Sequence, residues 1–167
     1  PGPLAAPPTQ SASPAGATHQ GPADRSPFGL PRAGKPVLFP RDRVLAYAVG
    51  APSEAFGPRY APFDHERRLA RLPGPPLMFV DRLTEIEPPP FELRPGGFIE
   101  AEYDVPADAF YFAANGQRSM PFFVILEAAL QPCGWLAAWL GSALRSDADL
   151  HFRNLDGQAV LHGEIGP

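Results

Sequence analysis

The sequence MPFFVILEAALQPCGWLAAWL, residues 120–140, is the longest apolar segment of the chain. Because strands rarely exceed about ten residues, this length and the helical spacing of its apolar residues predict a helix over 120–144. About twenty apolar residues could also span a bilayer, but Glu127, Gln131 and Pro132 interrupt the run and no basic flank marks a cytoplasmic side. A helix that is apolar on all sides is more often the core of a layered domain, so we predict a buried helix.

Glu127 is the one ionisable carboxylate inside this segment. Burying a lone carboxylate is costly unless it is paired or protonated. Gln131 lies one turn later on the same helix face and could hydrogen-bond it. A carboxyl kept neutral near pH 7 can give a proton to a leaving hydroxyl, as a dehydration requires. The alternative is a structural glutamate that reaches solvent or a backbone group, and composition alone favours this alternative.

The segments on either side of the apolar run have the alternation and turn residues of strands. We expect four strands in all: Leu77–Ile86, Phe98–Val105, Leu150–Phe152 and Gln158–Ile165. Turn residues in 154–157 predict a hairpin between the last two. The order of strands and helices therefore suits an α+β fold in which an antiparallel sheet packs on one buried helix.

Composition separates a flexible start from a folded remainder. Residues 1–35 are rich in Pro, Ala, Ser, Gly and Thr and predict a disordered linker, followed by a domain over 36–167. The net charge of −4 gives no electrostatic footprint for nucleic acid. Cys133 is the single cysteine, so no internal disulfide can form, and we expect a reducing, cytoplasmic location and a buried structural thiol.

Several strings carry a family likeness: Phe56–Tyr60, Pro75–Arg82, Asn115–Gln117, Met120–Phe122, Gln131–Trp135 and Phe152–Gly157. In these strings the chain resembles the FabA-like 3-hydroxyacyl dehydratase region of bacterial polyunsaturated fatty acid and polyketide synthases. The likeness covers about two thirds of the chain, from near Phe56 to Ile165. The Gln-Pro-Cys-Gly-Trp and Arg-Asn-Leu-Asp-Gly strings are its most specific parts.

The resemblance implies a hotdog fold, in which an antiparallel sheet wraps around one long central helix. It implies removal of water from a 3-hydroxyacyl thioester carried on the phosphopantetheine of an acyl carrier protein, with no metal or further cofactor. A second hotdog domain and the carrier protein are the implied partners, and neither nucleic acid nor a membrane is expected. Since a hotdog has further strands after Ile165, we expect the sheet to be C-terminally incomplete with an open edge.

In this family a His removes the C2 proton and an acid protonates the departing hydroxyl. The acid position falls on Glu127, and the His position holds Asn115, which cannot act as a base near neutral pH. None of the four histidines occupies that position. The residues expected to contact substrate are Phe112, Gly116, Met120, Pro121 and Gln131. A helix starting at Pro121 could also point backbone N–H groups at a thioester carbonyl, although a plain helix start explains the same proline.

Two roles remain for such a half. It could be a degenerate structural half that completes a double hotdog, which the missing base slightly favours, or it could lend Glu127 to a base on its partner. In either case we expect the isolated chain to be inactive. The rival functions are a non-catalytic scaffold that shapes the acyl tunnel and docks the carrier protein, and a hotdog thioesterase. The Asn-Gly-Gln and Gln-Pro-Cys-Gly-Trp strings argue against the thioesterase.

Overall fold

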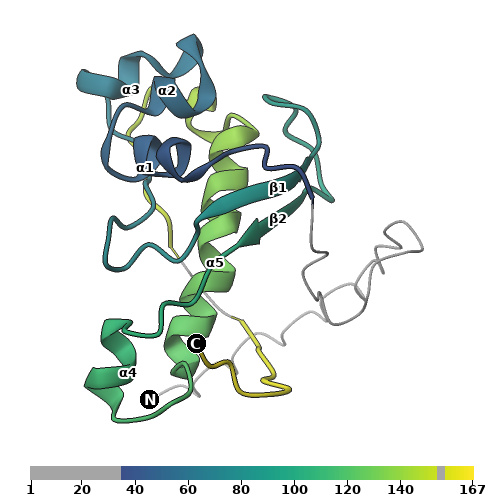
Figure 1. The fold of residues 1–167 in the computed structure, drawn as a ribbon. Coiled ribbons are helices and arrows are strands. Elements are labelled where there is room, and N and C mark those ends of the chain that lie inside the picture. The colour runs from purple at the N-terminus through teal and green to yellow at the C-terminus, as the bar shows by residue number, and fades with distance from the viewer. Residues whose placement is uncertain (1–34, 154–156) are drawn as a thin grey trace, which may run out of the picture. The chain divides into compact units, whose positions relative to one another are not determined.

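The computed structural model describes residues 35–153 and 157–167 (Figure 1). The predicted linker, except for its last residue, and most of the predicted hairpin turn lie outside these residues. The elements are α1 (Arg41–Val49), α2 (Pro52–Phe56), the 3₁₀ turn η1 (Pro58–Tyr60), α3 (Pro62–His65), β1 (Arg82–Glu87), β2 (Phe98–Glu102), α4 (Phe110–Asn115), α5 (Phe122–Trp139) and the 3₁₀ turn η2 (Ser142–Arg145).

The long apolar segment forms α5, which confirms the predicted helix and serves as the axis of the fold. The two strands cross it near its middle, α1 to α3 gather toward its C-terminal end, and α4 lies near its N-terminal end (Figure 1). Pro121 is the N-cap, one residue before the helix rather than its first residue, where its missing N–H still has no helical partner to lose. Gly141 then adopts a left-handed conformation with φ of 80°, so α5 ends well before residue 144.

The sheet is antiparallel, as predicted, and consists of β1 and β2 in the described part of the chain. Arg82 lies opposite Glu102 and Glu87 opposite Phe98. The first strand starts at Arg82 and not at Leu77. Met78 to Val80 are buried nevertheless, and the backbone around them is bonded by the side chain of Gln131 instead of by a neighbouring strand.

The two late strands are not observed. Residues 150–153 and 157–167 are irregular, and large apolar side chains such as Val160, 76% exposed, face outward. Ile165 accepts a backbone hydrogen bond of 2.7 Å from Met120, at the start of α5. Alternating apolar residues form a strand only where a neighbouring strand can hydrogen-bond their backbone. Neither β1 nor β2 pairs with these residues. The expected architecture of sheet against central helix therefore holds, with a smaller sheet.

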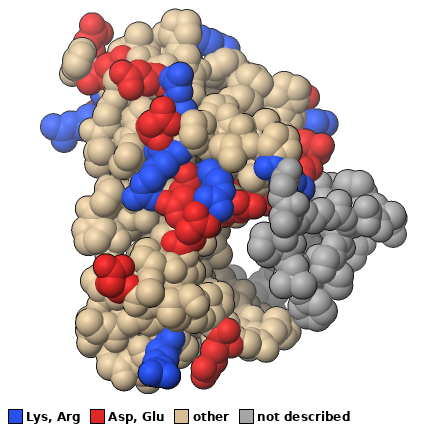
Figure 2. All heavy atoms as spheres, in the orientation of Figure 1, with Lys and Arg blue, Asp and Glu red and all other residues tan. Residues whose placement is uncertain are grey.

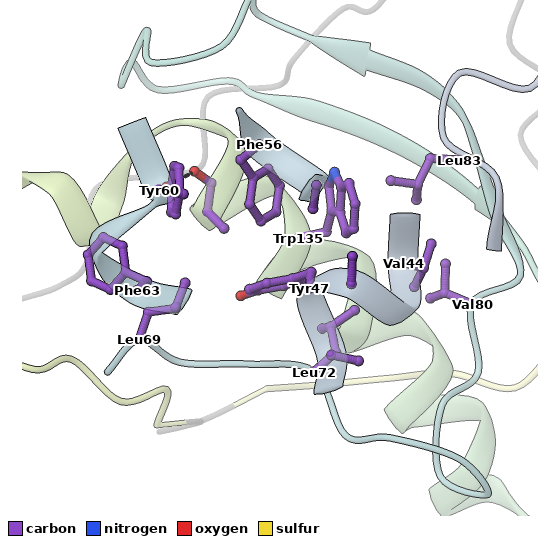
Figure 3. Packing of buried hydrophobic residues seen from close by; sticks show 14 of the residues in the cluster. Val44, Tyr47, Phe56, Tyr60, Phe63, Leu69, Leu72, Val80, Leu83 and Trp135 are labelled. Atoms are coloured by element: carbon purple, nitrogen blue, oxygen red, sulfur yellow. Dashed lines mark hydrogen bonds between the residues drawn. The ribbon is translucent and has the colours of Figure 1, made fainter. Parts of the chain in front are cut away.

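The main core surrounds the C-terminal half of α5. Trp135 is fully buried there, and its ring centroid lies 4.7 Å from that of Phe56, 5.6 Å from Tyr47 and 5.3 Å from Phe39 (Figure 3). Aromatic rings bury large apolar areas and gain from tilted and edge-to-face contacts. This cluster joins α1, α2 and the residues before α1 to the central helix.

Two buried tyrosines tie this core to the surrounding backbone. The hydroxyl of Tyr47 donates to the carbonyl of Ala70 at 2.6 Å, and the hydroxyl of Tyr60 donates to the carbonyl of Ala138 in α5. Burial raises the pKa of Tyr47 well above its usual range and that of Tyr60 to about 12. Both side chains are therefore held neutral and hydrogen-bonded inside the fold.

The N-terminal half of α5 is packed more lightly. Val124 and Met120 join a small cluster with Phe79 and Tyr111, while Phe122 and Phe123 are 48% and 64% exposed. Figure 2 shows few charged side chains around α4 and this end of α5. The prediction of a buried helix is thus right for the second half and wrong for the first turn. Among the described helices, α5 alone has the length and apolar composition to cross a bilayer, a property that core helices share.

Candidate functional site

Glu127 lies in the first half of α5 and faces a pocket of about 360 Å³. The carboxylate is partly buried, so it can meet both a ligand in the pocket and the protein behind it. The pocket runs between one face of α5 and the segment that precedes β1. Its walls include Arg71, Leu72, Glu127, Gln131, Gly134 and Phe152.

Gln131 holds the carboxylate of Glu127 in place. Its side chain is 3% exposed, and its Nε2 donates to Glu127 Oε1 at 3.1 Å, as the one-turn spacing predicts. The same amide accepts from the Phe79 backbone N–H at 2.7 Å and donates to the Leu77 carbonyl at 2.8 Å. Because the Phe79 N–H requires an acceptor, it fixes which end of the amide is oxygen, and the N–H groups must point to Leu77 and Glu127.

The wall of the pocket also has a fixed cation. One guanidinium nitrogen of Arg71 donates to the backbone carbonyls of Tyr47 at 3.1 Å and Gly50 at 2.8 Å, and the other donates to that of Phe63 at 3.4 Å. These bonds join the end of α1 and α3 to the rim of the pocket. Arg71 is not among the residues that the sequence predicts for the site.

A glycine allows side chains to pack closely against α5 at this point. A Cβ atom on Gly134 would lie 3.1 Å from Leu72 Cδ2 and 3.1 Å from Phe152 Cε2, closer than ordinary contacts. Cys133, next to it, also lines the pocket and is exposed, which contradicts the expected buried thiol. Its position on the outer face of α5 explains the difference, because Trp135 and Gln131 take the inward positions.

The other predicted site residues lie elsewhere. Asn115 is the exposed last residue of α4, and Gly116 caps that helix in a left-handed conformation with φ of 62°. Met120 is buried in the small cluster near the start of α5, and Phe112 packs against it. The structure therefore brings Glu127 and Gln131 together and leaves Asn115, Gly116, Phe112 and Met120 outside the wall of their pocket.

This arrangement can transfer one proton through an oriented carboxyl. No histidine is among the described residues that line the pocket of Glu127, and no group of three or more metal-binding side chains occurs in the described ranges. The Asn115 amide cannot serve as a base for C–H deprotonation. The described lining of the pocket thus combines a carboxyl and the amide that orients it, without an imidazole.

The family profile of the FabA-like domain matches residues 72–166, more than half of the chain. A polyunsaturated fatty acid synthase subunit from a Thraustochytrium strain is 29% identical over 135 residues, which cover 78% of this chain. The chain spans only 8% of that relative's length. The matched region begins at the pocket wall and includes both strands, α4 and α5 with Glu127 and Gln131. The chain therefore belongs to the FabA-like domain family, as a dehydratase-type region with a hotdog fold.

Proposed function

We propose that this chain is the acid-bearing half of a double-hotdog dehydratase in fatty acid or polyketide synthesis. Its substrate would be a 3-hydroxyacyl thioester on the phosphopantetheine of an acyl carrier protein. The observation that carries the proposal is the Glu127 carboxylate, which faces a pocket and is fixed from behind by Gln131. The described residues of this pocket include no base, and the second hotdog domain would supply one.

The proposed reaction needs one base and one acid. The base of the partner domain removes a proton from C2, the electrons of that C–H bond form the C2–C3 double bond, and the C3–O bond breaks. Glu127 in its acid form gives its proton to the departing hydroxyl, which leaves as water. The products are a 2-enoyl thioester, water, a Glu127 carboxylate and a protonated base. Loss of the proton from the base and return of one proton to Glu127 restore the site.

Gln131 is a positioning residue in this scheme. Its amide uses two bonds to the backbone of residues 77 and 79 and offers its remaining N–H to Glu127. That N–H stabilises the carboxylate formed once the proton has left, because hydrogen bonds to a charged acceptor are stronger than those to a neutral one. The same bond limits the directions in which Glu127 can present its proton.

The proposal is tested in the intact polypeptide with its second hotdog domain, using a 3-hydroxyacyl carrier substrate. We expect Glu127→Gln to lower the rate of enoyl formation by about 10²-fold or more, the usual contribution of a positioned acid. Asn115→Ala is the matched control and should leave the rate unchanged. Circular dichroism and the unfolding midpoint show whether each variant folds.

If the Glu127→Gln variant folds and its rate stays within about threefold of wild type, Glu127 is not the acid and the chain is a structural half of the double hotdog. Mass spectrometry of the product separates the rival enzyme, since a thioesterase releases a free acid and a dehydratase leaves the acyl group on the carrier. Release of free 3-hydroxy acid that depends on Glu127 would replace the proposal with the thioesterase.

A further inference from the structure

A second pocket of about 240 Å³ continues along α5 from the pocket of Glu127. The two pockets share Ala137 and Phe152 in their walls. Beyond these two residues the second pocket is mainly apolar, with Leu69, Ala138, Ala143 and Leu150 among its lining residues. Two adjoining pockets therefore lie along the second half of α5, and Ala137 and Phe152 form the partition between them.

Phe152 is the part of this partition that lies outside α5. Ala137 belongs to α5, whereas Phe152 lies in the irregular segment after η2 and is 46% exposed. Its ring edge lies against Gly134, at the position where any Cβ would be 3.1 Å from it. No hydrogen bond can fix a phenyl ring, so only packing against α5 keeps it between the two pockets.

The two pockets differ in the polarity of their walls. The first is suited to the polar thioester end of an acyl substrate and the second to its hydrocarbon tail. The first contains the Glu127 carboxylate, the Gln131 amide and two arginines, while the second has mostly apolar walls, with Tyr47, Ser142 and His151 as its polar lining residues. Gly134 follows Glu127 by seven residues, which places the partition about 10 Å along the helix at 1.5 Å per residue. A short acyl chain with its reacting carbons at Glu127 would end before the partition, and a long one would meet it.

We infer that Phe152 is a specificity-determining residue that closes one acyl groove into two compartments and so limits the length of the chain accepted. The inference rests on the proposed function, because it takes the thioester end of the substrate to lie at Glu127. Pockets for small molecules commonly occupy about 300–1,000 Å³. The first pocket alone is near the lower limit of that range, and both together lie well within it.

The test measures binding, so that it does not depend on a base. Butanoyl and dodecanoyl pantetheine amides, which cannot be hydrolysed as thioesters, are titrated against the full chain by calorimetry. The ratio of butanoyl affinity to dodecanoyl affinity should be higher in wild type than in the Phe152→Ala variant. We expect Phe152→Ala to tighten dodecanoyl binding about tenfold, since each newly buried methylene contributes to affinity, and to change butanoyl binding less than about twofold.

Two further variants keep the result interpretable. Phe152→Trp enlarges the partition and should weaken dodecanoyl binding while leaving butanoyl binding unchanged. Phe123→Ala removes an exposed phenylalanine that lines neither pocket and should alter neither affinity. Equal effects of Phe152→Ala on both probes, or no effect on either, would overturn the inference and leave the proposed function standing. Failure of wild type to bind either probe, with enoyl formation in the intact polypeptide also absent, would overturn both.

Discussion

The first half of α5, residues 122–130, is the more apolar in sequence, yet the second half, residues 131–139, has more buried side chains. The second half places Trp135 at the centre of an aromatic core, and the first half exposes Phe122 and Phe123 on its opening turn. Gln131 begins the second half, and Glu127 lies about one turn before it in the first half. The second half therefore serves two purposes, because Trp135 packs in the core while Gly134 and Ala137 line the pocket of Glu127.

Loss of the core tryptophan should have the largest effect on stability. Trp135→Ala removes a fully buried ring that contacts three other rings, and we expect a loss of about 3–5 kcal/mol in the free energy of unfolding. Urea denaturation measures it. Trp135→Phe should cost clearly less, because the indole N–H has no hydrogen-bond partner within the described part of the chain. A cost below about 1 kcal/mol for the alanine variant would contradict the assignment of the core.

Gln131 should rank next, because its amide bonds both the backbone of residues 77–79 and the Glu127 carboxylate. Gln131→Leu leaves the Phe79 N–H and the Leu77 carbonyl without their side-chain partner, and we expect a loss of about 2–3 kcal/mol. Glu127→Gln changes a partly exposed group and should cost under about 1 kcal/mol. Comparison of the two denaturation curves is the measurement, and equal costs would show that the amide does not hold residues 77–79.

The core half should also be sensitive to alkaline pH. Burial raises the pKa of Tyr47 above its ordinary value of 10.0 and that of Tyr60 to about 12. Folding thus favours the neutral form of both tyrosines. The stabilisation that this preference contributes is complete below pH 10 and is lost as the pH rises toward and beyond 12. The free energy of unfolding, measured from about pH 8 to 11.5, should fall above about pH 10. Tyr47→Phe should make that fall less steep, and an unchanged slope would count against a buried neutral Tyr47.

The exposed half should tolerate substitution with the smallest effect. Phe122→Ser and Phe123→Ser change side chains that are 48% and 64% exposed, so each should alter the free energy of unfolding by no more than about 0.5 kcal/mol. Both are measured in the same urea series as Trp135→Ala. A loss of several kcal/mol at either position would show that this turn is covered by the protein and that the two halves are alike.

Sequence patterns predict the central helix, the antiparallel pair and the bond between Glu127 and Gln131, because periodicity and one-turn spacing are local properties. They place the start of the first strand too early. Met78 to Val80 are buried and apolar, as strand residues are, but the backbone of this segment is bonded by the Gln131 amide and not by a neighbouring strand. The late strands fail for a related reason. Their pattern is right for a sheet, but pairing depends on a neighbour that sequence spacing cannot show.

Part of the site is equally beyond local patterns. Glu127 and Gln131 stand out because they interrupt an apolar helix. Arg71 and Phe152 line the same pocket from segments 56 and 25 residues away from Glu127 along the chain, and only folding brings them together. Phe112 and Met120, which the sequence predicts beside substrate, lie in the small cluster at the start of α5 and outside the wall of this pocket, and their contact with substrate stays a prediction.

Cys133 offers the most direct measurement of whether the pocket beside Glu127 receives an acyl thioester. It is the single cysteine, it is exposed, and it lines that pocket. Its rate of alkylation by iodoacetamide in the full chain, followed by mass spectrometry, should fall severalfold when butanoyl pantetheine amide is bound. The rate should stay constant with S-methyl pantetheine, whose blocked thiol cannot consume the reagent. An alkylation rate that saturating butanoyl pantetheine amide leaves unchanged would contradict the assignment of the pocket and of Glu127 as its acid.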